Sequence, residues 1–349
     1  MRGMKFPRPR RLRRALLAAA AFTALAALAP GAVAVAPSDL PSPEQGLNLL
    51  VVGIDSRKGV TDEEKERFRL GGQECDCTDV IMLVHVSAEN DRISVVSLPR
   101  DSLTAFPDQH RDRRTGKLHA AHPAKINNAW AEGGSSFTVE TVESMTGLPV
   151  HRYLEIDFRR FMDTVDRLDG GVPVCTAEPL KDPVTGIDLQ PGTKRVAGGE
   201  ALQYVRSRRA DGQMDFGRIQ KQQKFVANTL ERLREGVLDD PEALLDFAAT
   251  LRGTGAVERG ITATELLTLA ARLKDLPPDR TEFSTVPVRG FNPNIAGVGS
   301  TLAWDEKGAA EVFGRLREDR PLPEAGAVAP SEIPVGTYRP TPGSSLICP

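Results

Sequence analysis

Short runs of aliphatic and β-branched residues predict the first strands of the chain. Leu47–Ile54 is a nearly continuous apolar run with the length and composition of a buried strand. Two further runs, residues 80–86 and 92–98, are rich in Val and Ile and are separated by the polar residues 88–91. This pattern predicts an antiparallel hairpin that follows a buried strand.

The charged segment at residues 60–72 predicts a loop or a short helix. Along the rest of the chain, segments with helical periodicity alternate with shorter strand-like runs. Helices are predicted at residues 123–130, 136–145, 158–168 and 199–205, from about residue 216 onward, and at 238–251, 262–274 and 305–318. Strands are predicted at residues 150–156, 172–175, 281–288 and 298–303. The mixture indicates one α/β domain over residues 47–320, with a mixed central sheet between layers of helices.

Charged residues stand where the predicted strands end. Asp79 precedes the first strand of the hairpin, and Arg100 and Asp101 follow the second, so antiparallel pairing brings all three to one edge of the sheet. If the strand before the hairpin runs parallel to its second strand, Asp55 and Arg57 reach the same edge. Each residue alone is an ordinary strand-end residue, but their coincidence indicates a site.

The densest concentration of charge lies in residues 204–223, around glycines. Its cations and acids are Arg206, Arg208, Arg209, Arg218, Lys221, Asp211 and Asp215. The helix at 199–205 delivers the first two arginines at its C-terminal end, and the next helix begins near Phe216, after the turn signal Asp211-Gly212. Guanidinium forks and a helix N-terminus both suit phosphate oxygens. A solvated basic helix with surface ion pairs is the alternative interpretation.

The net charge of the chain is only −2, but the N-terminus is strongly basic. Residues 1–14 hold seven Lys or Arg and no acid, and the apolar residues 15–36 follow. A basic flank before an apolar segment predicts a cytoplasmic tail and an exported remainder. Residues 15–36 are long enough to span a bilayer, but Ala34-Val35-Ala36 also fits a cleavage site, so a membrane anchor and a removed signal peptide both remain open. Residues 37–46 form a polar, proline-rich linker.

The chain has four cysteines, which in an exported protein indicate disulfides. Cys75 and Cys77 are too close in sequence to favour a bridge with each other. Cys175 and Cys348 are therefore their expected partners, but the connectivity is open, and a bridge from Cys175 to Cys348 is one of the alternatives. Residues 321–349 are rich in Pro, Gly and Ala and predict a flexible tail, except where Cys348 is held.

The histidines are scattered along the sequence. His119 and His122 lie three residues apart, but no third ligand follows in register, so the sequence does not favour a metal site there. The Cys-Asp-Cys spacing is not a usual zinc pattern either. No nucleophile elbow, Walker loop or dinucleotide fingerprint occurs.

Seven motifs, in order from residue 47 to about residue 225, resemble those of the LytR-CpsA-Psr (LCP) family. They are Gly53-Ile-Asp55-Ser-Arg57, Thr78-Asp79-Val-Ile-Met-Leu-Val84, Ser97-Leu-Pro-Arg100-Asp101-Ser102, Lys125-Ile-Asn127, Asp166-Arg-Leu-Asp-Gly-Gly171, Ala201-Leu-Gln-Tyr-Val-Arg206-Ser-Arg208 and Asp215-Phe-Gly-Arg218-Ile-Gln-Lys-Gln222. Lys221 stands where many members have arginine, and Thr78-Asp79-Val80 replaces the common Ser-Asp-Thr. Both departures keep the chemistry of the position.

The resemblance implies an LCP-like fold in a single-pass membrane protein with a cytoplasmic N-terminus and an extracytoplasmic catalytic domain, which favours the anchor over the cleaved signal. It implies transfer of a glycopolymer from a polyprenyl-pyrophosphate lipid to peptidoglycan, with release of polyprenyl phosphate. The partners are then the lipid-linked glycopolymer, peptidoglycan and the membrane, and no nucleic acid. A non-catalytic envelope regulator that binds anionic polymer or lipid, or a polyprenyl-pyrophosphate hydrolase, is the alternative.

The resemblance also assigns roles to residues of this chain. Asp55 and Asp79 match aspartates that bind Mg²⁺. The positions implied to act on the pyrophosphate are Arg100, Asp101, Arg206, Arg208 and Arg218, and those implied to bind substrate are Arg57, Lys125, Asn127, Asp215, Lys221 and Gln222. The proton acceptor remains open between Asp101 and Asp79. The lipid tail requires an apolar cavity, expected between the sheet and the helix that carries Ile219, Val226 and Leu230.

Overall fold

The computed structural model describes residues 43–349 apart from 73–74, 76, 114, 209–213, 239, 252–258, 330 and 332–335. The predicted basic tail, the apolar segment 15–36, most of the linker and the turn signal Asp211-Gly212 lie outside the described residues. Among the helices that the structure describes, none combines the length and the apolarity that crossing a membrane requires.

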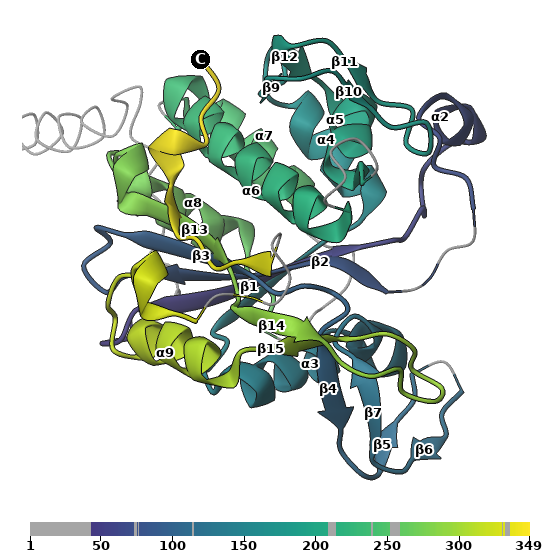
Figure 1. Cartoon of the computed structure of the whole chain (residues 1–349). Coiled ribbons are helices and arrows are strands. Elements are labelled where there is room, and N and C mark those ends of the chain that lie inside the picture. Colours follow the sequence, from purple (N-terminus) through teal and green to yellow (C-terminus); the bar gives the residue numbers. More distant parts are fainter. Residues whose placement is uncertain are drawn as a thin grey trace, which may run out of the picture. The chain divides into compact units, whose positions relative to one another are not determined.

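A six-stranded mixed sheet forms the centre of the fold, in the order β16-β13-β3-β2-β1-β8 (Figure 1). Its strands are β1 (Leu47–Ile54), β2 (Thr78–Val86), β3 (Ile93–Ser97), β8 (Arg152–Ile156), β13 (Thr281–Thr285) and β16 (Thr341–Pro342). β2 pairs antiparallel with both β1 and β3, whereas β8 runs parallel to β1, and β13 runs parallel to β3 and antiparallel to β16. β1 and β3 therefore point in the same direction and end at the same edge of the sheet.

Helices cover both faces of this sheet. In Figure 1, α6, α7 and α8 lie on one face, and α3 and α9 lie on the other. The helices are α2 (Asp62–Arg67), α3 (Asn128–Thr146), α4 (Phe158–Asp166), α5 (Gly198–Arg206), α6 (Met214–Arg232), α7 (Pro241–Leu251), α8 (Ala263–Leu273) and α9 (Glu306–Arg317). In β1, Leu50 and Val52 join the core under α3 and α9, while Leu47 and Val51 join the core under α6 and α8. Burial on both faces explains the continuous apolar run and confirms the predicted α/β class.

Small two-stranded sheets extend from the central domain. Their strands are β4 (Leu103–Phe106), β5 (His110–Arg111), β6 (Leu118–His119), β7 (His122–Lys125), β9 (Val172–Thr176), β10 (Leu180–Lys181), β11 (Asp188–Leu189), β12 (Gly192–Val196), β14 (Val288–Phe291) and β15 (Leu302–Trp304). β4 pairs with β7, β5 with β6, β9 with β12, β10 with β11, and β14 with β15. A short π-helix, Leu233–Val237, follows α6.

The predicted hairpin is confirmed as β2 and β3, and most predicted helices begin and end within a few residues of the observed ones. The predicted helix at residues 123–130 is wrong in its first half. Those residues form β7, which pairs antiparallel with β4, and Pro123 is tolerated there because β7 has no partner on its other side. The second half joins the next predicted helix as α3, which is interrupted at Gly134, where φ is 74°. The predicted strand at 281–288 divides into β13 and the start of β14.

Both disulfides that the structure describes involve cysteines that the sequence singled out. Cys175 is bonded to Cys348, as one of the open alternatives predicted. Cys75 is bonded to Cys77, so the expectation that these two would seek separate partners is wrong. The Cα atoms of Cys75 and Cys77 are 5.1 Å apart, which lies within the range that a disulfide spans.

The prediction of a flexible tail after residue 320 is wrong for the part of that segment that the structure describes. Leu322 and Tyr338 are buried in the main core, and β16 pairs with β13 at the sheet edge. Near its end, the Cys348 amide donates to Asn228 Oδ1 at 2.8 Å, and Asn228 Nδ2 donates to the Leu346 carbonyl at 2.9 Å. A proline-rich composition did not reveal these anchoring contacts.

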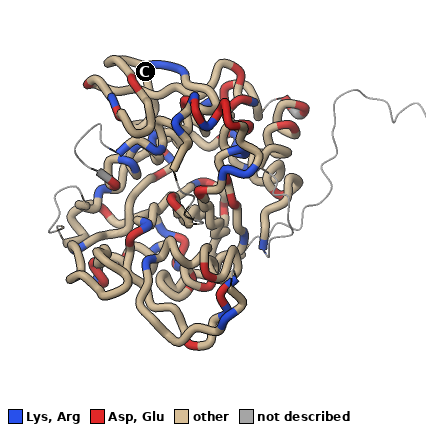
Figure 2. Tube along the Cα trace, turned by 90° about the vertical axis from the view of Figure 1, so that its right-hand side faces the viewer, with Lys and Arg blue, Asp and Glu red and all other residues tan. Residues whose placement is uncertain are grey.

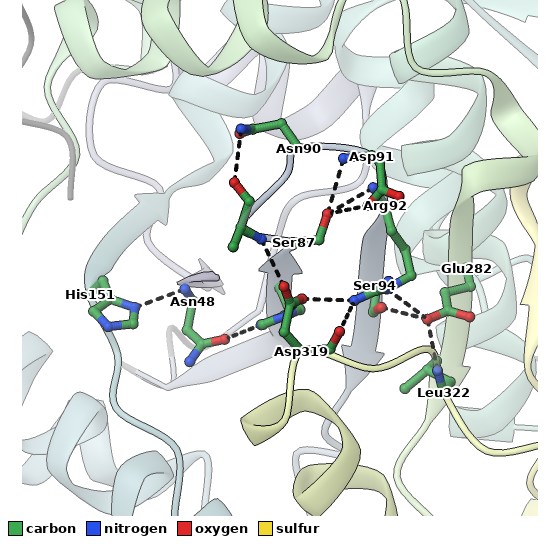
Figure 3. Close-up of polar contacts among 12 residues, drawn as sticks. Asn48, Ser87, Asn90, Asp91, Arg92, Ser94, His151, Glu282, Asp319 and Leu322 are labelled. Carbon is green, nitrogen blue, oxygen red and sulfur yellow. Dashed lines mark hydrogen bonds and ion pairs between the residues drawn. The ribbon is translucent and has the colours of Figure 1, made fainter. Parts of the chain in front are cut away.

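A buried polar network fixes the chain after α9 against the sheet (Figure 3). Asp319 accepts a hydrogen bond from Arg92 Nη2 at 2.8 Å and from the Ala88 amide at 3.0 Å, and it lies 3.0 Å from His85 Nε2. The other ring nitrogen of His85 lies 2.7 Å from Asn48 Oδ1. Burial lowers the pKa of His85, although Asp319 acts in the opposite direction. Asp319 is therefore the common partner of a cation, an amide and an imidazole.

Asp319→Ala is expected to lower the free energy of unfolding by about 3 kcal/mol, because it removes the nearer carboxylate of the largely buried Arg92 and leaves, among the described residues, only Glu282, 4.0 Å away. Denaturant unfolding of the protein measures this loss. Asp62→Ala is the matched control, since Asp62 pairs with Lys65 on the surface with its side chain 98% exposed, and it should change nothing measurable. Equal effects of the two substitutions would show that the network does not stabilise the fold.

Candidate active site

The predicted charged residues meet at one edge of the central sheet. Ile54 pairs with Thr78, so Asp55, just after β1, lies beside the start of β2, where Asp79 is the second residue. Arg100 follows β3 at the same edge. Figure 2 shows that basic and acidic residues are interspersed along the molecule. The charge of this site therefore arises from a local convergence of strand ends.

Two carboxylates hold three arginines together at this edge. Arg100 donates to Asp79, whose Oδ1 also lies 3.6 Å from Arg218 and 3.7 Å from Arg208. Asp215, in the first turn of α6, lies 3.1 Å from Arg208, 3.2 Å from Arg100 and 3.5 Å from Arg218. The strand edge and the N-terminal end of α6 are thus joined by ion pairs.

Electrostatics keep these groups charged. Burial acts to raise the pKa of Asp79 and of Asp215, but the guanidinium groups of Arg218 and Arg100 outweigh it, so both pKa values lie below the ordinary range. Arg218 is only 3% exposed, and its burial lowers its pKa to about 10. At neutral pH the carboxylates are ionised and the arginines are protonated. The edge presents fixed charges of both signs, with the cations in excess.

Residues at the end of β7 and just after it complete one side of the site. Lys125 Nζ lies 2.9 Å from Asp101 Oδ1. The Asn127 amide donates to the Arg100 carbonyl at 3.2 Å, and the Asn127 carbonyl accepts from the Thr78 amide at 3.3 Å. Asn127 therefore joins the start of β2 to the segment after β3 through its backbone. Among the described residues, its buried Oδ1 has no hydrogen-bond partner.

Asp55, Arg57 and Arg206 form the other side. Asp55 lies 3.3 Å from the buried Arg57, but its Oδ1 has no hydrogen-bond partner among the described residues. Burial raises the pKa of Asp55, with Arg57 acting against the rise and Asp79 adding to it. The Arg206 guanidinium lies 5.0 Å from the centre of the Phe158 ring, and its buried Nη1 likewise has no described partner. Two buried polar atoms on this side, Asp55 Oδ1 and Arg206 Nη1, thus lack a hydrogen bond among the described residues, although Asp55 Oδ1 lies within ion-pair distance of Arg57.

The arginines border an apolar cavity. Arg206, Arg218 and Gln222 line one end of it together with Asp79, and Gln222 also donates to the Val205 carbonyl at 3.2 Å. The remaining lining is apolar apart from Asp157 and comes from β1, β2, β8, α4, α5 and α6, with Val51, Met82, Ile156, Phe158, Phe161, Leu202, Phe225 and Val226 among its residues. Lys221 is buried in α6 but does not line the cavity. The structure thus brings Gln222 into the site and leaves Lys221 outside the lining.

A second apolar cavity continues the first between α6, α7 and α8. Both are lined by Ile156, Phe161, Phe225 and Val226, and the second extends to residues of α8. The sequence predicted a cavity between the sheet and α6, and Val226 and Leu230 do line it, whereas Ile219 is buried elsewhere. Sequence reasoning missed the phenylalanines. The signal for Phe158 and Phe161 is the predicted helix at residues 158–168, whose apolar face alone does not distinguish core residues from cavity-lining ones.

Comparisons with known proteins agree with this geometry. The model of the LytR_cpsA_psr family matches residues 26–318. The chain is 33% identical to the probable cell wall biosynthesis protein LcpB of Corynebacterium glutamicum over 78% of this chain and 61% of that protein. It is 23% identical to the polyisoprenyl-teichoic acid–peptidoglycan teichoic acid transferase TagU of Oceanobacillus iheyensis, over 79% of this chain and 78% of that protein. The chain spans about three fifths of the length of LcpB and of LcpA from the same organism.

Solved structures show the same fold. Bacillus subtilis TagV matches with a TM-score of 0.59 and 23% identity, over 80% of this chain and 99% of that one. The LytR-CPS2A-psr family protein YwtF (TagT), solved with bound octaprenyl pyrophosphate lipid, matches with a TM-score of 0.53 and 21% identity, over 82% of this chain and 95% of that one. Because the family model covers most of the sequence, including every motif at the sheet edge, the chain belongs to the LytR-CpsA-Psr family.

Proposed function

We propose that this protein transfers a glycopolymer from a polyprenyl-pyrophosphate carrier to peptidoglycan and releases polyprenyl phosphate. One observation carries the proposal: an apolar cavity is lined at its polar side by Arg206 and Arg218, and each of these guanidinium groups has a buried nitrogen without a hydrogen-bond partner among the described residues. A lipid pyrophosphate has the matching chemistry, an apolar tail attached to a polyanion. The name of the TagU relative and the lipid bound to the TagT structure support this choice of substrate.

The residues of the edge fit the steps of such a transfer. A peptidoglycan hydroxyl attacks the phosphorus that carries the glycan, a new P–O bond forms, and the bridging P–O bond to polyprenyl phosphate breaks. Arg100, Arg206, Arg208 and Arg218 neutralise the charge that develops on the phosphate oxygens. The hydroxyl proton passes to a carboxylate. Asp101 suits this role better than Asp79, because the low pKa of Asp79 makes it a weak base.

The residues present also fit a magnesium ion. Asp55 has a buried carboxylate oxygen without a hydrogen-bond partner among the described residues, and Asp79 is near enough to influence its pKa. Hard divalent cations prefer carboxylate oxygens. We assign Asp55 and Asp79 to hold the ion, which when bound neutralises charge on the pyrophosphate.

The proposal includes the location of the protein. Residues 1–14 form the cytoplasmic tail, residues 15–36 anchor the chain in the membrane, and the domain that follows is extracytoplasmic. The disulfide between Cys175 and Cys348 supports an oxidising compartment.

The cavity provides the test of the proposal. Val226 lines both cavities from α6 and is only partly buried, so Val226→Trp should fill the space that a lipid tail needs. Purified wild-type protein, given a polyprenyl-pyrophosphate glycan and peptidoglycan, is expected to form a glycan–peptidoglycan phosphodiester that mass spectrometry detects. Val226→Trp is expected to lose co-purified lipid and most of this product while remaining folded, because it fills existing space.

Val184→Trp is the matched control, since Val184 is 55% exposed and lies outside both cavities. It should keep both lipid and product. Lipid binding without product from any donor would favour a non-catalytic regulator, and release of free glycan phosphate would favour a hydrolase. Equal product from Val226→Trp and the wild type would contradict the assignment of the cavity.

A further inference from the structure

Three of the five histidines meet a glutamate in the small sheets beside α3. His110 in β5, His119 in β6, His122 at the start of β7 and Glu132 in α3 each offer one ligand atom, and these four atoms all lie within 4.8 Å of one another. The sequence showed only the spacing of His119 and His122. The fold adds His110, which pairs directly opposite His119, and Glu132, which α3 brings to the same point.

Backbone carbonyls orient two of the imidazole rings. His110 Nδ1 lies 3.0 Å from the Pro107 carbonyl oxygen, and His122 Nδ1 lies 2.9 Å from that of Ala120. A carbonyl oxygen only accepts, so each Nδ1 carries the hydrogen and each neutral ring has its lone pair on Nε2. Those two Nε2 atoms lie 2.8 Å and 3.4 Å from the same Glu132 oxygen. Three atoms with lone pairs thus converge when the rings are neutral, and either a proton or a metal ion between them removes their mutual repulsion.

Aromatic packing holds the rings in place. His110 is buried and stacks on Phe137 with ring centres 4.9 Å apart and an interplanar angle of 8°. Phe106 contacts His110 and His122 by its edge, at 5.7 Å and 5.5 Å. Ligands whose rings are fixed by packing lose little freedom when they bind a metal. The carbonyl contacts to Nδ1 are also those by which proteins commonly orient metal-binding histidines.

We propose that His110, His119, His122 and Glu132 bind a divalent transition-metal ion, for which Zn²⁺ is the best match. Three imidazoles and one carboxylate form a closed four-ligand set of the kind that holds structural zinc. In a tetrahedral zinc site the ligand atoms lie roughly 3.3 Å apart, so the most separated pair here must approach by about 1.5 Å. Mg²⁺ prefers an all-oxygen set and does not fit.

The position of this site suggests its effect. His122 begins β7 and Lys125 ends it, and Lys125 contacts Asp101 in the candidate active site. A metal bound across β5, β6, β7 and α3 would restrain the segment between β4 and β7. The metal site is therefore a positioning element for Lys125 and stands apart from the phosphate-binding edge. Its existence does not depend on the proposed transferase activity.

Metal binding to the full chain, purified in detergent without a histidine tag, tests the proposal. After treatment with a chelator, the wild type is expected to bind about one Zn²⁺ per chain, to gain several degrees in melting temperature on binding it, and to give with Co²⁺ the intense visible absorption of tetrahedral coordination. Elemental analysis, calorimetry and absorption spectroscopy measure these three properties.

The variants make the assignment specific. His119→Ala and Glu132→Gln should each lose the stoichiometric Zn²⁺ and the thermal shift, and Glu132→Gln keeps the shape of the side chain in case His119→Ala fails to fold. Lys117→Ala is the matched control, because Lys117 is exposed in the same segment and is no ligand. The proposal is overturned by a wild type that binds neither ion, or by folded His119→Ala and Glu132→Gln variants that bind Zn²⁺ as the wild type does.

Discussion

Arg218→Ala is expected to lower the rate of transfer by about two to three orders of magnitude and to leave the melting temperature nearly unchanged. The loss of rate follows from removing a buried fork of donors that faces the end of the apolar cavity. The small change in stability follows from the surroundings of the side chain. Burial lowers the pKa of Arg218, and Asp215 opposes this shift while Arg208 adds to it. Removing the side chain relieves a desolvation cost and a repulsion, and Arg208 still pairs with Asp215.

The matched control is Arg152→Ala, which should have the opposite effect. Arg152 in β8 pairs with Glu265, whose side chain is only 5% exposed, and lies outside the candidate active site. Its removal leaves a buried carboxylate without its ion-pair partner and should cost stability, while transfer is retained at a temperature where the variant is folded. Assays of product formation and of thermal unfolding on both variants separate the two roles. If Arg218→Ala kept its activity and unfolded at a much lower temperature, the arginine cluster would be a structural ion-pair network.

Much of the candidate site could be predicted because it depends on local order along the chain. Asp55, Asp79 and Arg100 each stand at the end of a short apolar run, and the rules of strand pairing alone bring such ends together. The helix boundaries near Arg206 and Asp215 follow in the same way from periodicity. Predicting where such residues lie requires no knowledge of how distant segments of the chain pack.

The rest depends on contacts between segments that no local pattern encodes. His110 and Glu132 meet because a two-residue pairing and a helix bring them together, and their spacing of 22 residues carries no signal. Phe225 lines the cavity from α6, but in the sequence it is one more apolar position of an amphipathic helix. The composition of residues 321–349, rich in Pro and Gly, led to the wrong prediction of a flexible tail. The disulfide of Cys348 and the pairing of β16 with β13 hold this segment. Tertiary packing decided each of these cases.

Removing divalent cations is expected to suppress product formation almost completely while lipid binding largely survives. In the proposed function, the guanidinium groups that line the cavity are expected to bind the pyrophosphate without help from a metal. Turnover requires more, because the leaving polyprenyl phosphate gains charge as the bridging P–O bond breaks. A regulator that only binds lipid would need the arginines alone. The dependence of turnover on the metal therefore separates an enzyme from a binder.

The experiment measures product and bound lipid under three conditions: in EDTA, after Mg²⁺ is restored, and after Zn²⁺ is restored. The comparison of Mg²⁺ with Zn²⁺ distinguishes a metal at Asp55 and Asp79 from one at His110, His119 and His122. Mg²⁺ alone should restore product in the wild type, whereas Asp79→Asn should stay inactive and still bind lipid. Asp55→Asn is the second variant, because Asp55 Oδ1 lacks a hydrogen-bond partner among the described residues and the amide keeps the shape of the side chain, although it also weakens the ion pair with Arg57. Asp62→Asn is the matched control, since Asp62 is an aspartate with its side chain 98% exposed, and it should keep the wild-type response to Mg²⁺. Full turnover in EDTA, or an Asp55→Asn variant as active as the wild type at limiting Mg²⁺, would exclude a metal held by Asp55 and Asp79 and leave the arginines as the sole source of positive charge.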